Sequence, residues 1–202
     1  MAIITANNQS MTAITSLPSG VSAKSMILLA TETASSSATI SFTSNIDDTY
    51  KEYQFHFIEM HPATNDTNFM FQTDTGTNTS YNQTMTTTFF DSAHREDDSD
   101  TAFGYAAGRD LAQSTSFQQL TGYQLSNDND GSASGELWIF SPSSSTYVKH
   151  FIARVNSYGN YPISVDSHIA GYFNTTTALT RVQFKMNSGN IDAGVIKMYG
   201  VS

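Results

Sequence analysis

The stretch Thr180-Arg181-Val182-Gln183-Phe184-Lys185-Met186 alternates polar and apolar side chains with a period of two residues. Successive side chains of an extended strand point to opposite faces, so Val182, Phe184 and Met186 share one face. The polar residues between them share the other face. One buried and one solvated face is typical of an antiparallel sheet, and the stretch therefore predicts an antiparallel β-protein.

Nine further segments have short patterns rich in β-branched and aromatic residues, and clusters of Gly, Pro, Asn, Asp and Ser separate them. The nine segments are Met26–Thr31, Ala38–Thr43, Glu52–His61, Asn68–Thr73, Met85–Phe90, Glu136–Phe140, Tyr147–Val155, His168–Phe173 and Val195–Tyr199. No fixed-period repeat is present, which argues against a propeller or solenoid. We therefore predict an all-β fold, a jelly-roll-like antiparallel β-sandwich formed by a single domain over residues 26–202.

Two segments of the chain have ambiguous patterns. Residues 102–114 are compatible with a short helix or a long loop, because Gly104 and Gly108 weaken the helical pattern. The acidic run Asp91–Asp100 is expected to be a solvated loop, with binding of a cation or a basic partner as the alternative.

Residues 1–25 are rich in Ser, Thr and Asn and fit neither a strand nor a helix for long. We predict that they form a short extended N-terminal arm that binds a partner, and a frayed terminus without a partner is the alternative. The candidate partner-binding residues of this arm are Ile3, Ile4, Met11, Ile14 and Leu17.

The composition excludes several classes of partner. The chain has 202 residues, 9 Lys and Arg against 18 Asp and Glu, and a formal net charge of −9. Nucleic acids and anionic membranes attract clustered Lys and Arg, so we expect neither as a partner. The longest apolar run, Met26–Ala30, is far shorter than the roughly 20 residues that span a bilayer. The absence of Cys excludes disulfides, thiolate metal sites and a Cys nucleophile.

No catalytic motif is present, and we predict no enzyme activity, cofactor or metal site. One alternative is a cation held by strand histidines together with Glu59 or Asp166; the histidines are His56, His150 and His168. A second alternative is a calcium loop at Asn127–Gly131, but Leu137 stands where the bidentate Glu of such a loop belongs. A polar turn is the favoured interpretation of this segment.

Aromatic side chains on loops could stack on sugars, as in lectins, although packing in a core or an interface is the commoner use of aromatic residues. The candidates are Tyr105, Tyr123, Tyr158 and Tyr161. They give a second hypothesis for function, recognition of a glycan.

Three stretches carry a resemblance to a known group of proteins: Phe140–Phe151, which contains Ser-Pro-Ser-Ser-Ser-Thr-Tyr, Ala170–Thr176, and Ser188–Gly200. They are similar to small virion proteins of tailed phages, including marine and freshwater phages and cyanophages. The segments Ile40–Asp47, Tyr50–Pro62 and Asp110–Ser114 fit the same pattern, so the resemblance covers roughly residues 26–202. The motifs are turns and strands.

The resemblance implies a β-sandwich displayed on the virion, commonly as a homotrimer, that either cements the capsid or forms part of a tail fibre. Because only about 25 residues precede the sandwich, we expect a capsid cement or decoration protein that binds the major capsid protein or other virion proteins on the head surface. It would assemble in the cytoplasm of the host bacterium. The alternative is a tail-fibre or receptor-binding module that recognises a glycan.

Overall fold

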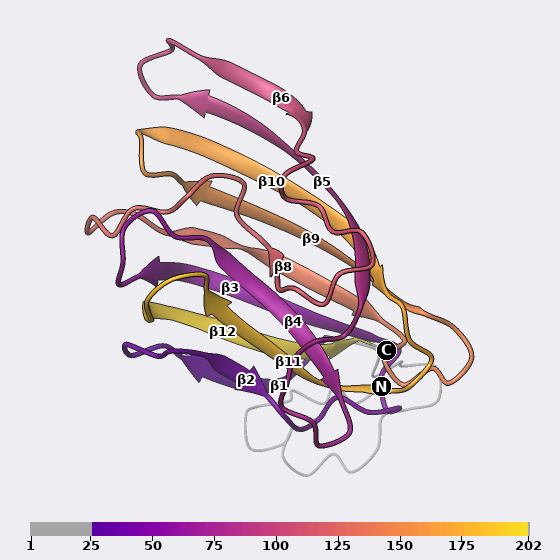
Figure 1. Ribbon diagram of the computed structural model, residues 1–202. Helices are drawn as coiled ribbons and strands as arrows, with labels where there is room; N and C mark the ends of the chain where they lie inside the picture. Colours follow the sequence, from indigo (N-terminus) through magenta and orange to yellow (C-terminus); the bar gives the residue numbers. More distant parts are fainter. Residues whose placement is uncertain (1–25, 202) are drawn as a thin grey trace, which may run out of the picture.

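The computed structural model describes residues 26–201, which form two antiparallel sheets packed as a β-sandwich (Figure 1). The larger sheet has eight strands in the order β1-β12-β3-β8-β9-β10-β5-β6, and the smaller has four in the order β2-β11-β4-β7. The strands are β1 (Ile27–Thr33), β2 (Ile40–Phe42), β3 (Glu52–Pro62), β4 (Phe69–Thr75), β5 (Met85–Arg95), β6 (Thr101–Tyr105), β7 (Gln118–Gln119), β8 (Ala133–Phe140), β9 (Lys149–Tyr158), β10 (Ile163–Phe173), β11 (Leu179–Met186) and β12 (Ile191–Val201).

All ten predicted strands are confirmed, and the predicted all-β sandwich with them. The structure adds β6 and β7, which the sequence analysis missed. Residues 101–105 form β6, and no helix occurs between residues 26 and 201, so the helix considered for residues 102–114 is wrong. The jelly-roll connection pattern itself stays a prediction. The predicted arm, with Ile3, Ile4, Met11, Ile14 and Leu17, lies outside the described residues.

The core lies between the two sheets and is centred on Phe184 of β11. The Phe184 ring contacts the rings of Phe57 and Phe55, with centroids 5.2 Å and 5.5 Å away, and stacks on Phe69 at 5.8 Å. All of these side chains are fully or almost fully buried. Such aromatic pairs add to the hydrophobic energy of burial, so the period-two pattern of β11 supplies the centre of the sandwich.

The smaller sheet leaves part of the inner face of β5 and β10 uncovered, and the segment 106–125 covers it. This segment first runs along the edge of β5, where the Thr87 amide donates to the Leu111 carbonyl at 2.8 Å. It then crosses the inner face, where the Gly122 amide donates to the Ser167 hydroxyl at 2.8 Å. The long segment is therefore a structural cover of the sandwich.

The acidic run Asp91–Asp100 is only partly the solvated loop that the sequence predicted. Residues 91–95 belong to β5, and Asp91 points inward with 7% of its surface exposed. The Arg109 guanidinium of the covering segment lies 3.1 Å from the Asp91 carboxylate. The remaining residues form the turn between β5 and β6. The sequence did not show that Asp91 points inward, because Asp91 is part of an acidic run and its partner Arg109 lies in another segment.

Candidate functional site

The outer face of the large sheet presents the alternate residues of the strands whose other residues form the core. On β9, Phe151, Ala153 and Val155 are buried, whereas Ile152 and Arg154 are exposed. The same alternation holds along β10 and β5. Along these strands the outer face is therefore open to solvent.

A row of polar and aromatic side chains crosses this face at right angles to the strands. The register pairs His56 of β3 with Glu136 of β8, Glu136 with Arg154 of β9, and Arg154 with His168 of β10. His168 in turn pairs with Phe90 of β5. Directly paired residues point to the same face of a sheet, so these five side chains form one continuous row.

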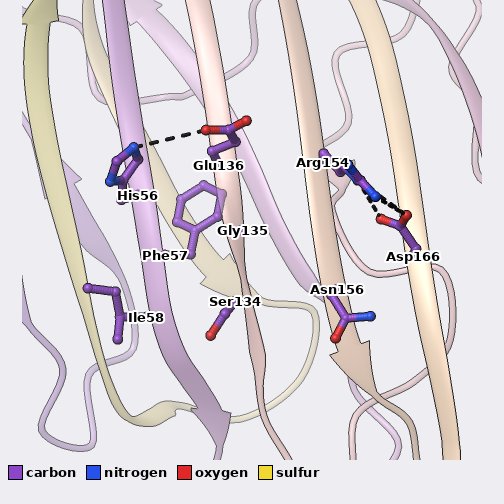
Figure 2. Close-up of a pocket in the computed structure, with 9 residues that line it drawn as sticks. All are labelled: His56, Phe57, Ile58, Ser134, Gly135, Glu136, Arg154, Asn156 and Asp166. Atoms are coloured by element: carbon purple, nitrogen blue, oxygen red, sulfur yellow. Dashed lines mark hydrogen bonds and ion pairs between the residues drawn. The ribbon is translucent and has the colours of Figure 1, made fainter.

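The row borders a first hollow of about 540 Å³ (Figure 2). Arg154 binds Asp166 through Nε and Nη2, with the shortest contact at 2.7 Å, and the His56 ring lies 4.0 Å from the Glu136 carboxylate. Figure 2 shows these two pairs on four neighbouring strands, with Asn156 beside Asp166. Six of the nine residues that line the hollow have hydrogen-bonding side chains.

A second hollow of about 330 Å³ adjoins the first and is more aromatic. Trp138, Ile152 and Ala170 line it together with the rings of Phe90 and His168. These two rings are stacked, with centroids 5.0 Å apart and planes 1° from parallel. Glu136 and Arg154 line both hollows, which therefore adjoin on opposite sides of this pair; we call the two hollows together the outer-face groove.

Hydrogen bonds hold the two carboxylates of the groove, Asp166 and Glu136, in place. The hydrogen bonds from Arg154 lower the pKa of Asp166 below its ordinary value, against the effect of its partial burial. Asp166 is therefore ionised at neutral pH. Glu136 accepts a hydrogen bond of 2.6 Å from the amide of Gln54, which is 2% exposed. The buried Gln54 holds the Glu136 carboxylate at its place in the row.

The structure brings only one candidate pair of cation ligands together, His168 and Asp166, with the His168 Nε2 atom 3.2 Å from the Asp166 carboxylate. His56 and His168 lie in the same row, but the strands β8 and β9 separate them. His150 lies beside Tyr172, with ring centroids 6.2 Å apart. Among residues 26–201 no group of three or more His, Cys, Asp or Glu side chains could hold a metal ion. The cation hypothesis for these histidines thus has no geometric support.

The segment Asn127–Gly131 forms a polar turn in the described structure. The Gly131 amide donates to the Asp128 carbonyl at 2.9 Å, and the Ser126 hydroxyl donates to the Asp128 carboxylate at 2.6 Å. The Asp128 carboxylate is therefore bound within the turn, which agrees with the favoured interpretation.

Of the four candidate tyrosines, only Tyr123 and Tyr161 line one pocket. Tyr105 pairs with Phe90 in the register of β5 and β6, so it lies beside the outer-face groove. Tyr123 packs against the small cluster of Ala93, Ile163 and Val165 under the Arg109 guanidinium. Tyr161, which is 58% exposed, lines with Tyr123 a pocket of about 360 Å³, and Tyr158 is half-buried at the end of β9.

Sequence analysis missed the aromatic half of the groove, formed by Trp138, Ile152 and the stacked Phe90 and His168. The available signal was the alternation within the predicted strands Glu136–Phe140 and Tyr147–Val155. The residues that alternate with the buried ones there include the apolar Trp138, Phe140 and Ile152, and an apolar residue on the solvent face of a strand indicates a contact surface.

No protein-family model matches this sequence, and neither the curated proteins nor the solved structures contain a significant match to it. Among the described residues, no helix is long and apolar enough to cross a membrane.

Proposed function

We propose that this chain is a structural protein of a phage virion, most simply a capsid cement or decoration protein that binds the outside of the head shell as a homotrimer. The proposal combines the sequence resemblance with the surface of the sandwich. Its partners are the major capsid protein or other virion proteins, and its role needs no cofactor, metal or catalytic residue.

The observation that carries the proposal is the position of β1, which is the last strand at one end of the large sheet. Within the described residues β1 pairs only with β12, so its other edge has unpaired backbone groups. Met26, directly before this strand, is 42% exposed, and Ile27 and Leu28 on it are 41% and 52% exposed. An exposed apolar edge strand is prone to pair with other chains and is normally protected in a monomer. This edge is therefore suited to contact a protein.

The proposed arm adds to the same surface. Residues 1–25 precede β1 directly in the chain, so a partner that contacts the β1 edge is within reach of the arm. The apolar residues Ile3, Ile4, Met11, Ile14 and Leu17 would then bind the shell or a neighbouring subunit. Burial of each such side chain contributes about 1.5–3 kcal/mol, so a few of them are enough to hold a short segment on a partner.

A co-sedimentation assay tests the proposal with undecorated heads of the phage that carries the gene. The full chain is expected to sediment with the heads. Deletion of residues 2–20 and the variant Leu28→Lys should each abolish binding while leaving a folded soluble protein. The matched control Thr176→Lys, on an exposed loop, should bind like the wild type. Unchanged binding by both the deletion and Leu28→Lys would overturn the proposed contact surface.

The oligomeric state is tested separately by light scattering on the purified protein. A homotrimer is expected to have three times the chain mass of 22.0 kDa. A mass of 22.0 kDa at all concentrations would contradict the trimer.

The alternative function is a tail-fibre or receptor-binding module that recognises a glycan, and the aromatic groove on the outer face favours it. Immunogold labelling of whole virions separates the two roles. Label on the heads supports decoration, and label on the tails supports receptor binding.

A further inference from the structure

The two adjoining hollows of the outer-face groove lie on the two sides of Glu136 and Arg154, and together they extend over β3, β8, β9 and β10 to Phe90 of β5. Four spacings of about 4.8 Å between strands give this surface an extent of about 19 Å across the sheet. A surface of this extent is suited to a chain molecule rather than a single small ligand. We propose that it binds a neutral oligosaccharide, whether the protein is located on heads or on tails.

The aromatic half of the groove provides flat apolar surfaces for sugar rings. The stacked rings of Phe90 and His168 and the side chain of Trp138 line this half. An aromatic ring carries partial negative charge on its face, so it attracts the C–H groups on one side of a pyranose ring. Ile152 and Ala170 lie between these aromatic residues and keep the surface apolar.

The polar half of the groove provides donors and acceptors for hydroxyl groups. Arg154 binds Asp166 through Nε and Nη2, which leaves Nη1 without a hydrogen-bond partner among residues 26–201. Glu136 and Asn156 add further oxygen and nitrogen atoms. Hydroxyl groups can both donate and accept, so a polyhydroxylated ligand satisfies this mixed set better than a purely apolar one.

The charges of the groove and of the chain select a neutral saccharide. The groove carries the carboxylates of Glu136 and Asp166 against the single guanidinium of Arg154. The whole chain has a net charge of −9, so an anionic polysaccharide would be repelled. A fatty or purely aromatic ligand would instead leave these charged groups without water or partners.

Trp138 gives the experiment a built-in reporter, because it is the single Trp of the chain and lines the groove. The full-length protein is first screened on an array of neutral oligosaccharides of glucose, galactose, mannose and N-acetylglucosamine, with uronic acid oligomers in parallel. The neutral probes that bind are then titrated while tryptophan fluorescence is recorded. Saturable binding of at least one neutral probe with a change in emission is expected.

The variant Ala170→Arg places a long side chain in the groove at an exposed position and removes no interaction of the fold. It should weaken binding of the neutral probe at least tenfold, whereas Thr176→Arg, on an exposed loop outside the groove, should bind like the wild type. Circular dichroism and thermal unfolding establish that both variants fold. Because Ala170 is remote from β1, head binding by Ala170→Arg should be unchanged, so failure of this proposal is distinguishable from failure of the decoration role.

Three results would overturn the proposal. They are the absence of binding to every neutral probe, binding of the uronic acid oligomers alone, and equal binding by the wild type and Ala170→Arg. The last result would place any saccharide site elsewhere on the protein.

Discussion

The two faces of the large sheet are built from the same strands but follow different rules. On the inner face of β9, Phe151 packs edge-on against Phe71 of the smaller sheet, with ring centroids 5.1 Å apart. On the outer face of the same strand, Ile152 is 47% exposed and Arg154 forms an ion pair across to β10. One residue of displacement along a strand separates a position fixed by packing from a position free to bind a ligand.

The difference shows where function can reside in this fold. Inner-face side chains fill a closed volume, so their identity is constrained by the fit to their neighbours. Outer-face side chains contribute little to that fit. A groove of aromatic and charged residues on the outer face is therefore less constrained by packing, which supports the binding role proposed for it.

The largest expected effect is on the inner face. Phe184→Ala removes the ring at the centre of the aromatic core, where Phe184 is fully buried. We expect it to lower the free energy of unfolding by about 3–5 kcal/mol. The neighbouring variant Lys185→Ala, on the other face of β11, should change it by no more than about 1 kcal/mol. Chemical denaturation measures the free energy of unfolding of both variants. Similar losses for the two variants would contradict the difference between the inner and outer faces.

A smaller effect is expected where two strands approach closely. A Cβ atom on Gly135 of β8 would lie 2.3 Å from the Arg154 carbonyl oxygen and 2.7 Å from the Val155 Cα. These neighbours are backbone atoms that cannot move aside, so Gly135→Ala should cost about 1–3 kcal/mol of unfolding free energy. Gly104→Ala on β6 is the matched control, because a Cβ there meets nothing within 4 Å. A neutral Gly135→Ala would show that the sheet is more adaptable than described.

The smallest effect is a difference in pH dependence between two carboxylates on opposite faces. Burial raises the pKa of inward-facing Asp91 above its ordinary value, although Arg109 partly offsets the shift. Arg154 lowers the pKa of outward-facing Asp166. A raised pKa in the folded state adds stability at low pH that is lost as the pH rises, and a lowered pKa adds stability that is lost as the pH falls.

Denaturation curves of the wild type, Asp91→Asn and Asp166→Asn from about pH 6 to about pH 3 test this contrast. On acidification, the stability of the wild type relative to Asp166→Asn should fall, and its stability relative to Asp91→Asn should rise. Equal trends for the two variants would contradict the assignment of the two carboxylates to different environments.

The sequence predicted the sandwich because a half-buried strand alternates apolar and polar residues. The strand β6 was not predicted because all five of its residues are exposed, so its sequence does not alternate between buried and exposed residues. The strand β7 has two residues, too few for a pattern. The groove was not predicted for another reason. The strand order β8-β9-β10-β5 brings Trp138 and Phe90 to one surface although they are far apart in the sequence. Local periodicity gives each strand's two faces but not the order of the strands.

The proposed role in the virion is tested most directly by electron cryomicroscopy of undecorated heads mixed with the purified full-length protein. We predict regular density at symmetry positions on the outside of the shell, with the β1 edge and the arm toward the shell. Bare shells, with the protein found on tails or free in solution, would contradict the decoration role.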